Sequence, residues 1–235
     1  MAGQGKRFKD KGYIEPKPLI SVGGKTMIEW ALSSLVSSQH NFHFIFVVQK
    51  IDLTQGLYDI LKDKGEIISV ESFTEGAVNS AMLADSFINN DSPLIIANCD
   101  QYIAWNIDDF IEYSLKYDSS VVVFNSGWPA YSYVKINGDL VIEVKEKVVI
   151  SNLACGGIYF YGQGSYFING AKELIRSNER TNGEFYISPV FNELIKEGKT
   201  VSYFKIEPNN VHMLGTPEEI KTFLSEPQIM IKELH

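Results

Sequence analysis

The sequence predicts an α/β domain with a mostly parallel, mixed β-sheet and helices on both faces. In the first half of the chain, short runs of β-branched and aromatic residues alternate with segments whose apolar residues recur at helical spacing. Repeated strand and helix units of this kind build parallel sheets. In the second half several predicted strands follow one another, which adds antiparallel strands to the sheet.

The first half opens with a loop rich in glycine and lysine. Apolar residues from Met27 to Leu35 then recur at helical spacing, and the apolar run 42–48 follows, so we expect a helix and then a strand. The alternation continues with predicted helices near 53–62 and 76–88 and predicted strands at 67–70 and 93–97, the last apolar enough to be buried.

The second half begins with a predicted helix near 107–117. Asn137-Gly138-Asp139 predicts a hairpin turn, because Asn and Gly accept the positive φ that such turns require. No repeat, low-complexity segment or linker interrupts the chain, so we expect one domain over residues 1–235. The remaining predicted strands are 121–124, 133–136, 141–144, 158–161 and 201–206, and the remaining helices are 166–176, 188–196 and a last one opened by Pro217.

Size and composition narrow the function classes. With 235 residues, 45% of them hydrophobic, the chain can bury a large core. A net charge of −8 without a basic stripe argues against a nucleic-acid partner. Cys99 and Cys155 follow no metal or redox spacing, so we expect reduced thiols. The sequence has no apolar run of membrane-spanning length and no secretory signal, which predicts a cytoplasmic protein without membrane contact.

The N-terminal loop is the first candidate site. Gly3-Gln4-Gly5-Lys6-Arg7-Phe8 and the later Lys17 combine bare backbone amides with several cations. Glycines let the backbone approach phosphate oxygens, and Arg7 and Lys17 can neutralise charge on a leaving group, so the loop suits a triphosphate. A flexible basic tail is the alternative interpretation. A dinucleotide fingerprint and a P-loop are excluded, because Phe8 and Leu19 stand where these motifs require glycine.

A phosphate-binding glycine loop normally follows the first strand of an α/β sheet, whose carboxyl end aims it at the ligand. No predicted strand precedes this loop. We therefore expect one of two situations. Either a short apolar first strand is missing, the chain starting inside the true reading frame, or the sheet contains an unpaired central position.

The pattern Gly3-x-Gly5-x-Arg7-Phe8, followed by Lys17-Pro18-Leu19, resembles the signature of the sugar-1-phosphate nucleotidyltransferases, or nucleoside-diphosphate-sugar pyrophosphorylases. Weaker motifs continue the resemblance, in order, to about residue 223. It implies a Rossmann-like, GT-A-like fold whose first strand this chain lacks. It implies that Arg7 and Lys17 are catalytic and hold the triphosphate and the attacking phosphate. It implies nucleotide contacts at Ala2, Gly3, Gly5 and Lys6.

Two further motifs extend the nucleotide site that the resemblance implies. Thr74-Glu75-Gly76 lies where the family reads a base edge, which implies base contacts from Thr74 and Gly76, although Thr74 also suits a helix N-cap. The strand ending at Ala97 leads into Asn98 and Asp100, at the sheet edge where α/β proteins bind ligands. The resemblance implies that Asn98 contacts the nucleotide and that Asp100 is catalytic and binds Mg²⁺, which prefers carboxylates and phosphate oxygens. An aspartate that only caps a turn is the alternative.

The sequence departs from the family pattern at the position of the second metal ligand. Many relatives have an aspartate two residues before the Gly-Thr-Pro turn, where this chain has Met213. Either Asp100 and substrate oxygens hold the metal alone, or His212 or Asn210 approaches it. Imidazole is an indifferent Mg²⁺ ligand, so His212 is a weak candidate.

The resemblance places the sugar phosphate on the second half of the chain. It implies contacts from Glu146, Lys147 and Gly157, and from Glu184 as an acceptor for sugar hydroxyls, although Glu184 also suits a helix N-terminus. The nucleotide-binding part would cover about 1–105 and the sugar-phosphate-binding part about 106–225.

The expected function is Mg²⁺-dependent transfer of a nucleotidyl group from a nucleoside triphosphate to a sugar 1-phosphate, with release of pyrophosphate. The base, the sugar and the oligomeric state stay open, a homo-oligomer included. Two alternatives also stay open. One is a cytidylyltransferase that acts on a phosphorylated alcohol such as phosphocholine. The other is a non-catalytic subunit that binds nucleotide sugars.

Overall fold

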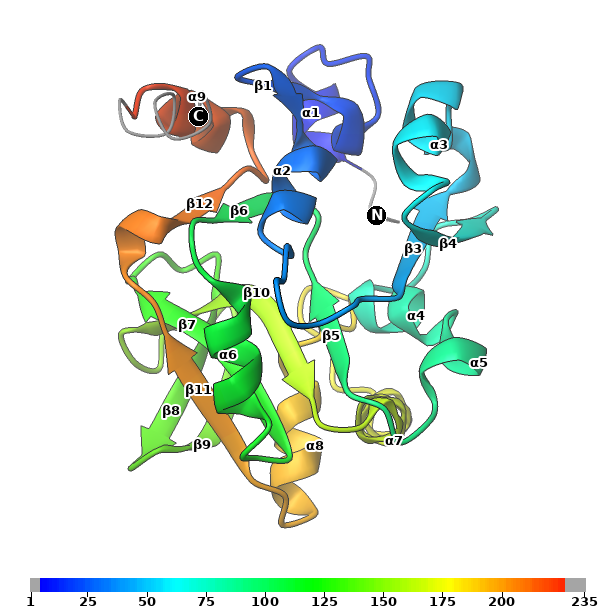
Figure 1. Cartoon of the computed structure of the whole chain (residues 1–235). Coiled ribbons are helices and arrows are strands. Elements are labelled where there is room, and N and C mark those ends of the chain that lie inside the picture. Colours follow the sequence, from blue (N-terminus) through cyan, green and yellow to red (C-terminus); the bar gives the residue numbers. More distant parts are fainter. Residues whose placement is uncertain (1–4, 227–235) are drawn as a thin grey trace.

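The computed structural model describes residues 5–226, which form an α/β fold around a six-stranded sheet (Figure 1). The strand order is β5-β10-β7-β11-β9-β8. The bounds are β5 (Leu94–Ala97), β10 (Leu153–Tyr161), β7 (Ser119–Asn125), β11 (Val201–Lys205), β9 (Leu140–Glu146) and β8 (Ser132–Asn137). Separate two-stranded pairs are β3 (Phe44–Gln49) with β4 (Gly65–Val70), β6 (Gln101–Ile103) with β12 (Val211–Met213), and β1 (Ser21–Val22) with β2 (Lys25–Thr26).

The α/β class is confirmed, but the expectation of a mostly parallel sheet is wrong. Strand β11 pairs in parallel with β7, and β3 with β4. The other pairings in the described six-stranded sheet are antiparallel, because β10 runs in reverse between β5 and β7 and because β8 and β9 form a hairpin. The hairpin turns at the predicted Asn137-Gly138-Asp139, where Gly138 has φ +59°.

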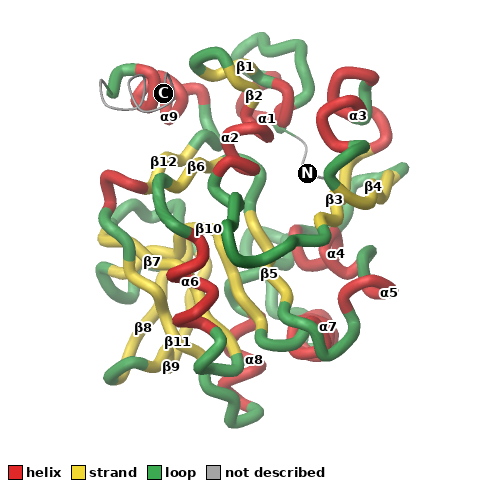
Figure 2. Tube along the Cα trace, viewed as in Figure 1, coloured by secondary structure: helices red, strands yellow, loops and turns green. Residues whose placement is uncertain are grey.

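Helices cover both faces of this sheet (Figures 1 and 2). The predicted helix 76–88 is interrupted and forms two short helices, α4 (Ala77–Met82) and α5 (Asp85–Ile88). The other helices are α1 (Lys6–Lys9), α2 (Met27–Ser33), α3 (Gln55–Leu61), α6 (Ile107–Ser114), α7 (Gly164–Arg176), α8 (Val190–Lys196) and α9 (Pro217–Leu224), with 3₁₀ turns η1 (Lys17–Leu19), η2 (Lys50–Asp52) and η3 (Pro208–Asn210). Among the described residues, no helix has both the length and the apolar character needed to cross a bilayer.

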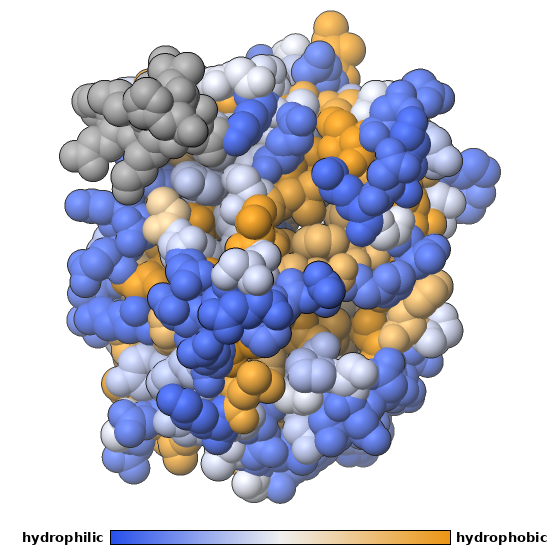
Figure 3. Space-filling view, in the orientation of Figure 1, coloured by the Kyte–Doolittle hydropathy of each residue, from blue (hydrophilic) through white to orange (hydrophobic). Residues whose placement is uncertain are grey.

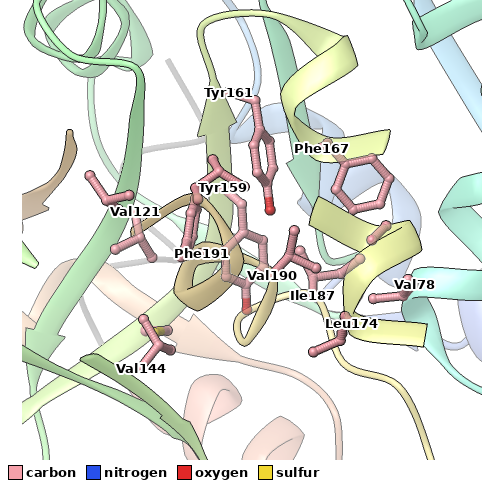
Figure 4. Packing of buried hydrophobic residues seen from close by; sticks show 14 of the residues in the cluster. Val78, Val121, Val144, Tyr159, Tyr161, Phe167, Leu174, Ile187, Val190 and Phe191 are labelled. Carbon is pink, nitrogen blue, oxygen red and sulfur yellow. The ribbon is translucent and has the colours of Figure 1, made fainter. Parts of the chain in front are cut away.

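The two-residue period of β7 divides the core between the two faces. Val121 and Val123 belong to the cluster under α7 and α8, where Phe167 and Phe191 pack (Figure 4). Val122 belongs to the cluster on the opposite face, under α6. Alternate side chains of a strand point to opposite faces, so one central strand contributes to both layers.

Strand β5 is less buried than its apolar sequence predicts. All four of its residues are half-buried, whereas all nine residues of the neighbouring β10 are buried. In the described part of the chain β5 pairs with β10 alone, so its other edge has no strand beside it.

A third cluster holds the N-terminal segment over the end of β5. Phe8 and Trp30 pack there against Phe223 of α9, and the indole Nε1 of Trp30 donates to the carbonyl of Val22 at 2.7 Å. Thr26 caps α2 and exchanges hydrogen bonds with Glu29. These contacts fix the position of the loop that carries Lys17.

Candidate active site

Lys17 and Asp100 form the centre of the candidate site. Asp100 follows β5, and its Oδ2 lies 2.5 Å from Nζ of Lys17, 83 residues away in the sequence. The two side chains are 23% and 30% exposed. Burial alone would lower the pKa of Lys17 and raise that of Asp100, but their mutual attraction outweighs it, so the pKa of Lys17 is raised and that of Asp100 lowered. Both groups are therefore charged near neutral pH.

The glycine loop lies beside this pair. Gly5 is so close that a Cβ placed on it would lie 3.5 Å from Cβ of Lys17. Arg7 is exposed, and its charge acts on both Lys17 and Tyr186. Ala2 and Gly3, which the sequence also assigns to the nucleotide, lie outside the described residues. Lys6 is the first residue of α1.

A second carboxylate, which sequence reasoning missed, lies next to Asp100. A Cβ on Gly215 would lie 3.0 Å from Oδ2 of Asp100 and 3.4 Å from Oε2 of Glu219. Burial raises the pKa of Glu219, and repulsion from Asp100 raises it further. Only a residue without a side chain leaves this space between the two carboxylates free.

Asn98, Gln101 and Gly157 form a polar floor beside Asp100. The amide of Asn98 donates to the carbonyl of Gly157 at 2.9 Å. Gly157 has φ +72°, and a Cβ on it would lie 2.1 Å from Oε1 of Gln101 and 2.6 Å from Nδ2 of Asn98. The side chain of Gln101 is buried, and neither its oxygen nor its nitrogen has a hydrogen-bond partner among the described residues. A buried amide of this kind is costly unless a ligand satisfies it.

Gly76 and Glu184 both line the cavity, and the loops that carry them are in contact. Backbone hydrogen bonds from Phe185 to Glu75 and from Val78 to Phe185 join the two loops, and a Cβ on Gly76 would lie 2.4 Å from the carbonyl oxygen of Phe185. Arg180 adds an ion pair with Glu75. The contact explains why glycine is required at position 76.

Thr74 does not have the N-cap role considered from the sequence. Gly76 is the N-cap residue of α4, without a side-chain cap. The hydroxyl of Thr74 instead donates to the carbonyl of Gly76 at 3.0 Å and lies 2.6 Å from the hydroxyl of Ser80.

Glu146 and Lys147 end strand β9 with different surroundings. Glu146 is buried and accepts hydrogen bonds from Ser132 and from Ser188, the latter at 2.9 Å. Burial raises its pKa against the lowering effect of these hydrogen bonds. Lys147 donates to the hydroxyl of Tyr186 and lies 4.1 Å from the centre of its ring.

Tyr186 connects these residues to Glu184. Burial raises the pKa of the Tyr186 hydroxyl, and a hydrogen bond with Glu184 raises it further. The tyrosine therefore stays protonated and links the Lys147 ammonium to the site.

His212 has a packing role. It lies on β12 opposite Tyr102 of β6, and its ring stacks on Tyr102 at 5.7 Å and meets Phe223 edge-on at 5.3 Å. Its Nδ1 faces Oε2 of Glu226 at 3.3 Å. These contacts account for the histidine without a metal. Asn210, the other candidate, accepts a hydrogen bond from the amide of Ala104 through its own carbonyl.

One cavity of about 1300 Å³ joins much of this site. Its polar end is lined by Gly5, Arg7, Lys17, Gly76, Asn98, Asp100, Glu184, Tyr186 and Gly215. Its other end runs between β3 and β5 and is apolar, and the space-filling view shows hydrophobic residues gathered in a hollow there (Figure 3). Glu146 and Lys147 do not line this cavity, and Lys147 reaches it through Tyr186. Of the polar floor, Asn98 lines the cavity, whereas Gln101 and Gly157 lie behind it.

The profile of the nucleotidyl transferase family matches residues 1–210. The chain belongs to this family.

A relative in Methanococcus maripaludis, the bifunctional protein GlmU, is 27% identical over 205 residues, which cover 84% of this chain. The chain spans only 46% of that relative's length. A nucleoside-diphosphate-sugar pyrophosphorylase from Vibrio cholerae has the same fold, with a TM-score of 0.84, 24% identity, and 96% of this chain and 98% of that one covered. A putative glucose-1-phosphate thymidylyltransferase from Bacillus anthracis gives a TM-score of 0.75 at 19% identity, over 94% and 90% of the two chains.

The site can neutralise the phosphate charges of a nucleotide, and its cavity can enclose one. Cations of Lys17 and Arg7 face one cavity, next to the carboxylates of Asp100 and Glu219. The residues missed from the sequence are Gln101, Tyr186, Gly215 and Glu219. Only Glu219 had a local signal, the Thr216-x-x-Glu219 spacing, and that spacing indicates a helix cap.

Proposed function

We propose that this chain transfers a nucleotidyl group from a nucleoside triphosphate to a sugar 1-phosphate and releases pyrophosphate, with Mg²⁺ as cofactor. The observation that carries the proposal is the Lys17–Asp100 pair, held at the carboxyl end of β5 and facing one cavity with Gly5 and Arg7. Membership of the nucleotidyl transferase family supports it.

The reaction needs alignment and neutralisation of anions more than proton transfer. The phosphate of the sugar 1-phosphate is already an anion at neutral pH, so it can attack the α-phosphorus without a general base. Lys17 and Arg7 lower the repulsion between the two anions and stabilise the pyrophosphate that leaves. Asn98, which lines the cavity and is held by its hydrogen bond to Gly157, orients the acceptor at the same place.

The chemistry of the donors fits a divalent cation. No cluster of three or more His, Cys, Asp or Glu side chains that could hold a metal occurs within residues 5–226. Carboxylate oxygens of Asp100 and Glu219 nevertheless border the same space at Gly215, and substrate oxygens would complete the ligand set. Lys17 already neutralises Asp100, so Glu219 contributes the additional negative charge. When bound, Mg²⁺ would neutralise phosphate charge and orient the phosphates.

The Glu219 assignment can be tested apart from turnover. Mg²⁺ is titrated calorimetrically into the protein saturated with a non-hydrolysable triphosphate. We expect Glu219→Gln to weaken Mg²⁺ binding roughly tenfold or more. Glu218→Gln is the matched control, because Glu218 is the neighbouring carboxylate with a side chain 66% exposed. Equal affinities in the two variants would remove Glu219 from the metal site.

The acceptor side is built from the loops of Glu184 and Lys147. Glu184 lines the cavity and its carboxylate can accept hydrogen bonds from sugar hydroxyls. Glu146 is already engaged by Ser132 and Ser188, so we propose that it holds the shape of this wall and leaves the hydroxyls to Glu184. Lys147 adds positive charge through its contact with Tyr186.

The first experiment measures pyrophosphate release with Mg²⁺, using CTP, UTP, dTTP, ATP and GTP against a panel of sugar 1-phosphates and phosphorylated alcohols. A signal that is selective for one nucleotide, requires a sugar 1-phosphate and disappears with EDTA and in Asp100→Ala supports the proposal. A signal with CTP and a phosphorylated alcohol would change the acceptor. Ligand binding without turnover across the panel would favour the non-catalytic binding subunit.

A further inference from the structure

Two loops that line the cavity serve different substrates under the proposed function. Residues 74–78, which we call the nucleotide loop, contribute Gly76 to the cavity wall. Residues 178–186, which we call the acceptor loop, contribute Glu184 and Tyr186. A contact that joins the two loops therefore also joins the places where the two substrates bind.

The backbones of the two loops are in direct contact. The amide of Phe185 donates to the carbonyl of Glu75 at 2.9 Å, and the amide of Val78 donates to the carbonyl of Phe185 at 3.1 Å. A Cβ on Gly76 would lie 2.4 Å from the carbonyl oxygen of Phe185. At such close packing, neither loop can shift without moving the other.

A tight turn gives the acceptor loop a defined shape. Thr181 and Glu184 exchange backbone hydrogen bonds, both at 3.0 Å. Between them Asn182 has φ +51° and Gly183 has φ +83°. An Asn-Gly pair with two positive φ values is typical of a type I′ turn, which reverses the chain within two residues. The turn brings the two arms of the acceptor loop side by side.

Arg180 connects this turn to the nucleotide loop, 105 residues away in the sequence. Its Nε donates to Oδ1 of Asn178 at 2.7 Å, and its Nη1 donates to the carbonyl of Gly183 at 2.9 Å. Its Nη2 donates to the carboxylate of Glu75. The guanidinium lies 4.0 Å from the centre of the ring of Phe185, which is buried.

These contacts exceed those of an ordinary surface ion pair. A single exposed pair contributes little, because solvent screens it and two long side chains must be ordered. Arg180 instead uses all three of its side-chain nitrogens, and its planar group stacks on an aromatic ring, so its side chain is only 31% exposed. Arg180 and Glu75 do not line the cavity. They can act on a substrate only through the two loops.

We propose that Arg180 is a positioning residue that couples the two substrate sites, so that each substrate strengthens the binding of the other. The inference rests on the proposed function. A nucleotide that orders the nucleotide loop also orders the acceptor loop through Arg180 and Phe185, so less conformational entropy is lost when the acceptor binds. Such coupling is reciprocal, and it is the same in size for both substrates.

Calorimetry measures this coupling. The α,β-methylene analogue of the active nucleotide is titrated into the protein with and without the sugar 1-phosphate that gives the strongest pyrophosphate release. We expect the sugar 1-phosphate to raise the affinity for the analogue about fivefold or more in the unmodified chain and less than about twofold in Arg180→Met. Methionine keeps apolar contact with Phe185 but removes the donors. The KM for the acceptor should rise by a similar factor, with kcat changed by less than about twofold.

Arg176→Met is the matched control. Arg176 also forms an ion pair, with Glu173 on the same helix, but its side chain is 78% exposed and joins no loops, so the coupling should be unchanged. Glu75→Gln should lose part of the coupling, and the double variant with Arg180→Met should lose no more than Arg180→Met alone. Unchanged coupling in Arg180→Met, with or without a lower Tm, would overturn the proposal, as would an equal loss in Arg176→Met.

A measurement on the ligand-free protein separates this proposal from the proposed function. The amides of Val78 and Phe185 bond across the two loops, so their hydrogen exchange reports whether the loops open together. We expect Arg180→Met to speed exchange at both amides by about threefold or more and Arg176→Met to change neither. If no nucleotide is turned over, the proposed function fails, and faster exchange would still support the joining of the loops by Arg180. Exchange at the same rates in Arg180→Met would overturn it.

Discussion

Strands β5 and β10 lie side by side in one sheet and are both apolar, yet their burial differs. Every residue of β10 is buried between β5 and β7, whereas every residue of β5, which pairs with β10 alone among the described strands, is half-buried. Between these two apolar strands, the difference in burial follows the number of neighbouring strands and not the composition. The comparison also separates two regions of the molecule. The closed region around β7 and β10 contributes to the two large core clusters, and the open region around β3 and β5 borders the cavity of the candidate site.

The comparison is sharpest for two isoleucines on the adjacent strands. Ile158 of β10 is fully buried, and Ile95 of β5 packs on the same cluster but is half-buried. We expect Ile158→Ala to lower the free energy of unfolding by about 2–5 kcal/mol and Ile95→Ala by roughly half as much. Urea unfolding of both variants measures this. Equal losses would contradict the comparison.

Lys17 tests the open region. A change there should lower turnover more than it lowers stability, in contrast to the change in β10. We expect Lys17→Ala to lower kcat/KM by about 10²–10³-fold, since it removes a cation that stabilises phosphate charge in the transition state. The variant also leaves the largely buried Asp100 carboxylate without its cation, so Tm should fall as well, by less than the loss of turnover would suggest. The measurements are pyrophosphate release and thermal unfolding, with Lys11→Ala as control because the Lys11 side chain is 62% exposed. Wild-type rates in Lys17→Ala would exclude the lysine from the mechanism.

Gly157 lies where the two regions meet. Its φ of +72° and the close approach of Gln101 both disfavour a side chain. We expect Gly157→Ala to cost about 1–3 kcal/mol in stability, from backbone strain and displacement of Gln101, and to raise the KM for the acceptor. Gly138→Ala is the matched control, because Gly138 has φ +59° and no atom within 4 Å of its Cβ position. If both variants lose the same stability and KM is unchanged, the polar floor has no role in binding.

The smallest expected effect concerns His212. Burial lowers its pKa below the usual 6.5, and the carboxylate of Glu226 opposes this only in part. The unfolded chain then binds a proton that the folded protein does not, so stability falls as the pH drops below about 6.5. His212→Phe preserves the aromatic packing and removes this titration. Between pH 7 and 5 it should reduce the pH dependence of the unfolding free energy by at most about 1.4 kcal/mol per pH unit. The same slope in both proteins would contradict this.

The sequence by itself determined the α/β class, most helices and strands, and the hairpin at Asn137-Gly138-Asp139, because periodicity and turn chemistry act over a few residues. It also singled out Lys17 and Asp100, which the structure brings to 2.5 Å of each other.

Only the tertiary structure decided the strand order, the reversal of β10 and the position of Glu219 and Gln101. Strand pairing and burial depend on residues far apart in the chain, so local patterns cannot specify them. Asp100 shows the physical reason, since its charged state depends on Lys17, 83 residues away. The half-burial of β5 has the same origin, because β10, the strand that pairs with it, comes from a distant part of the sequence.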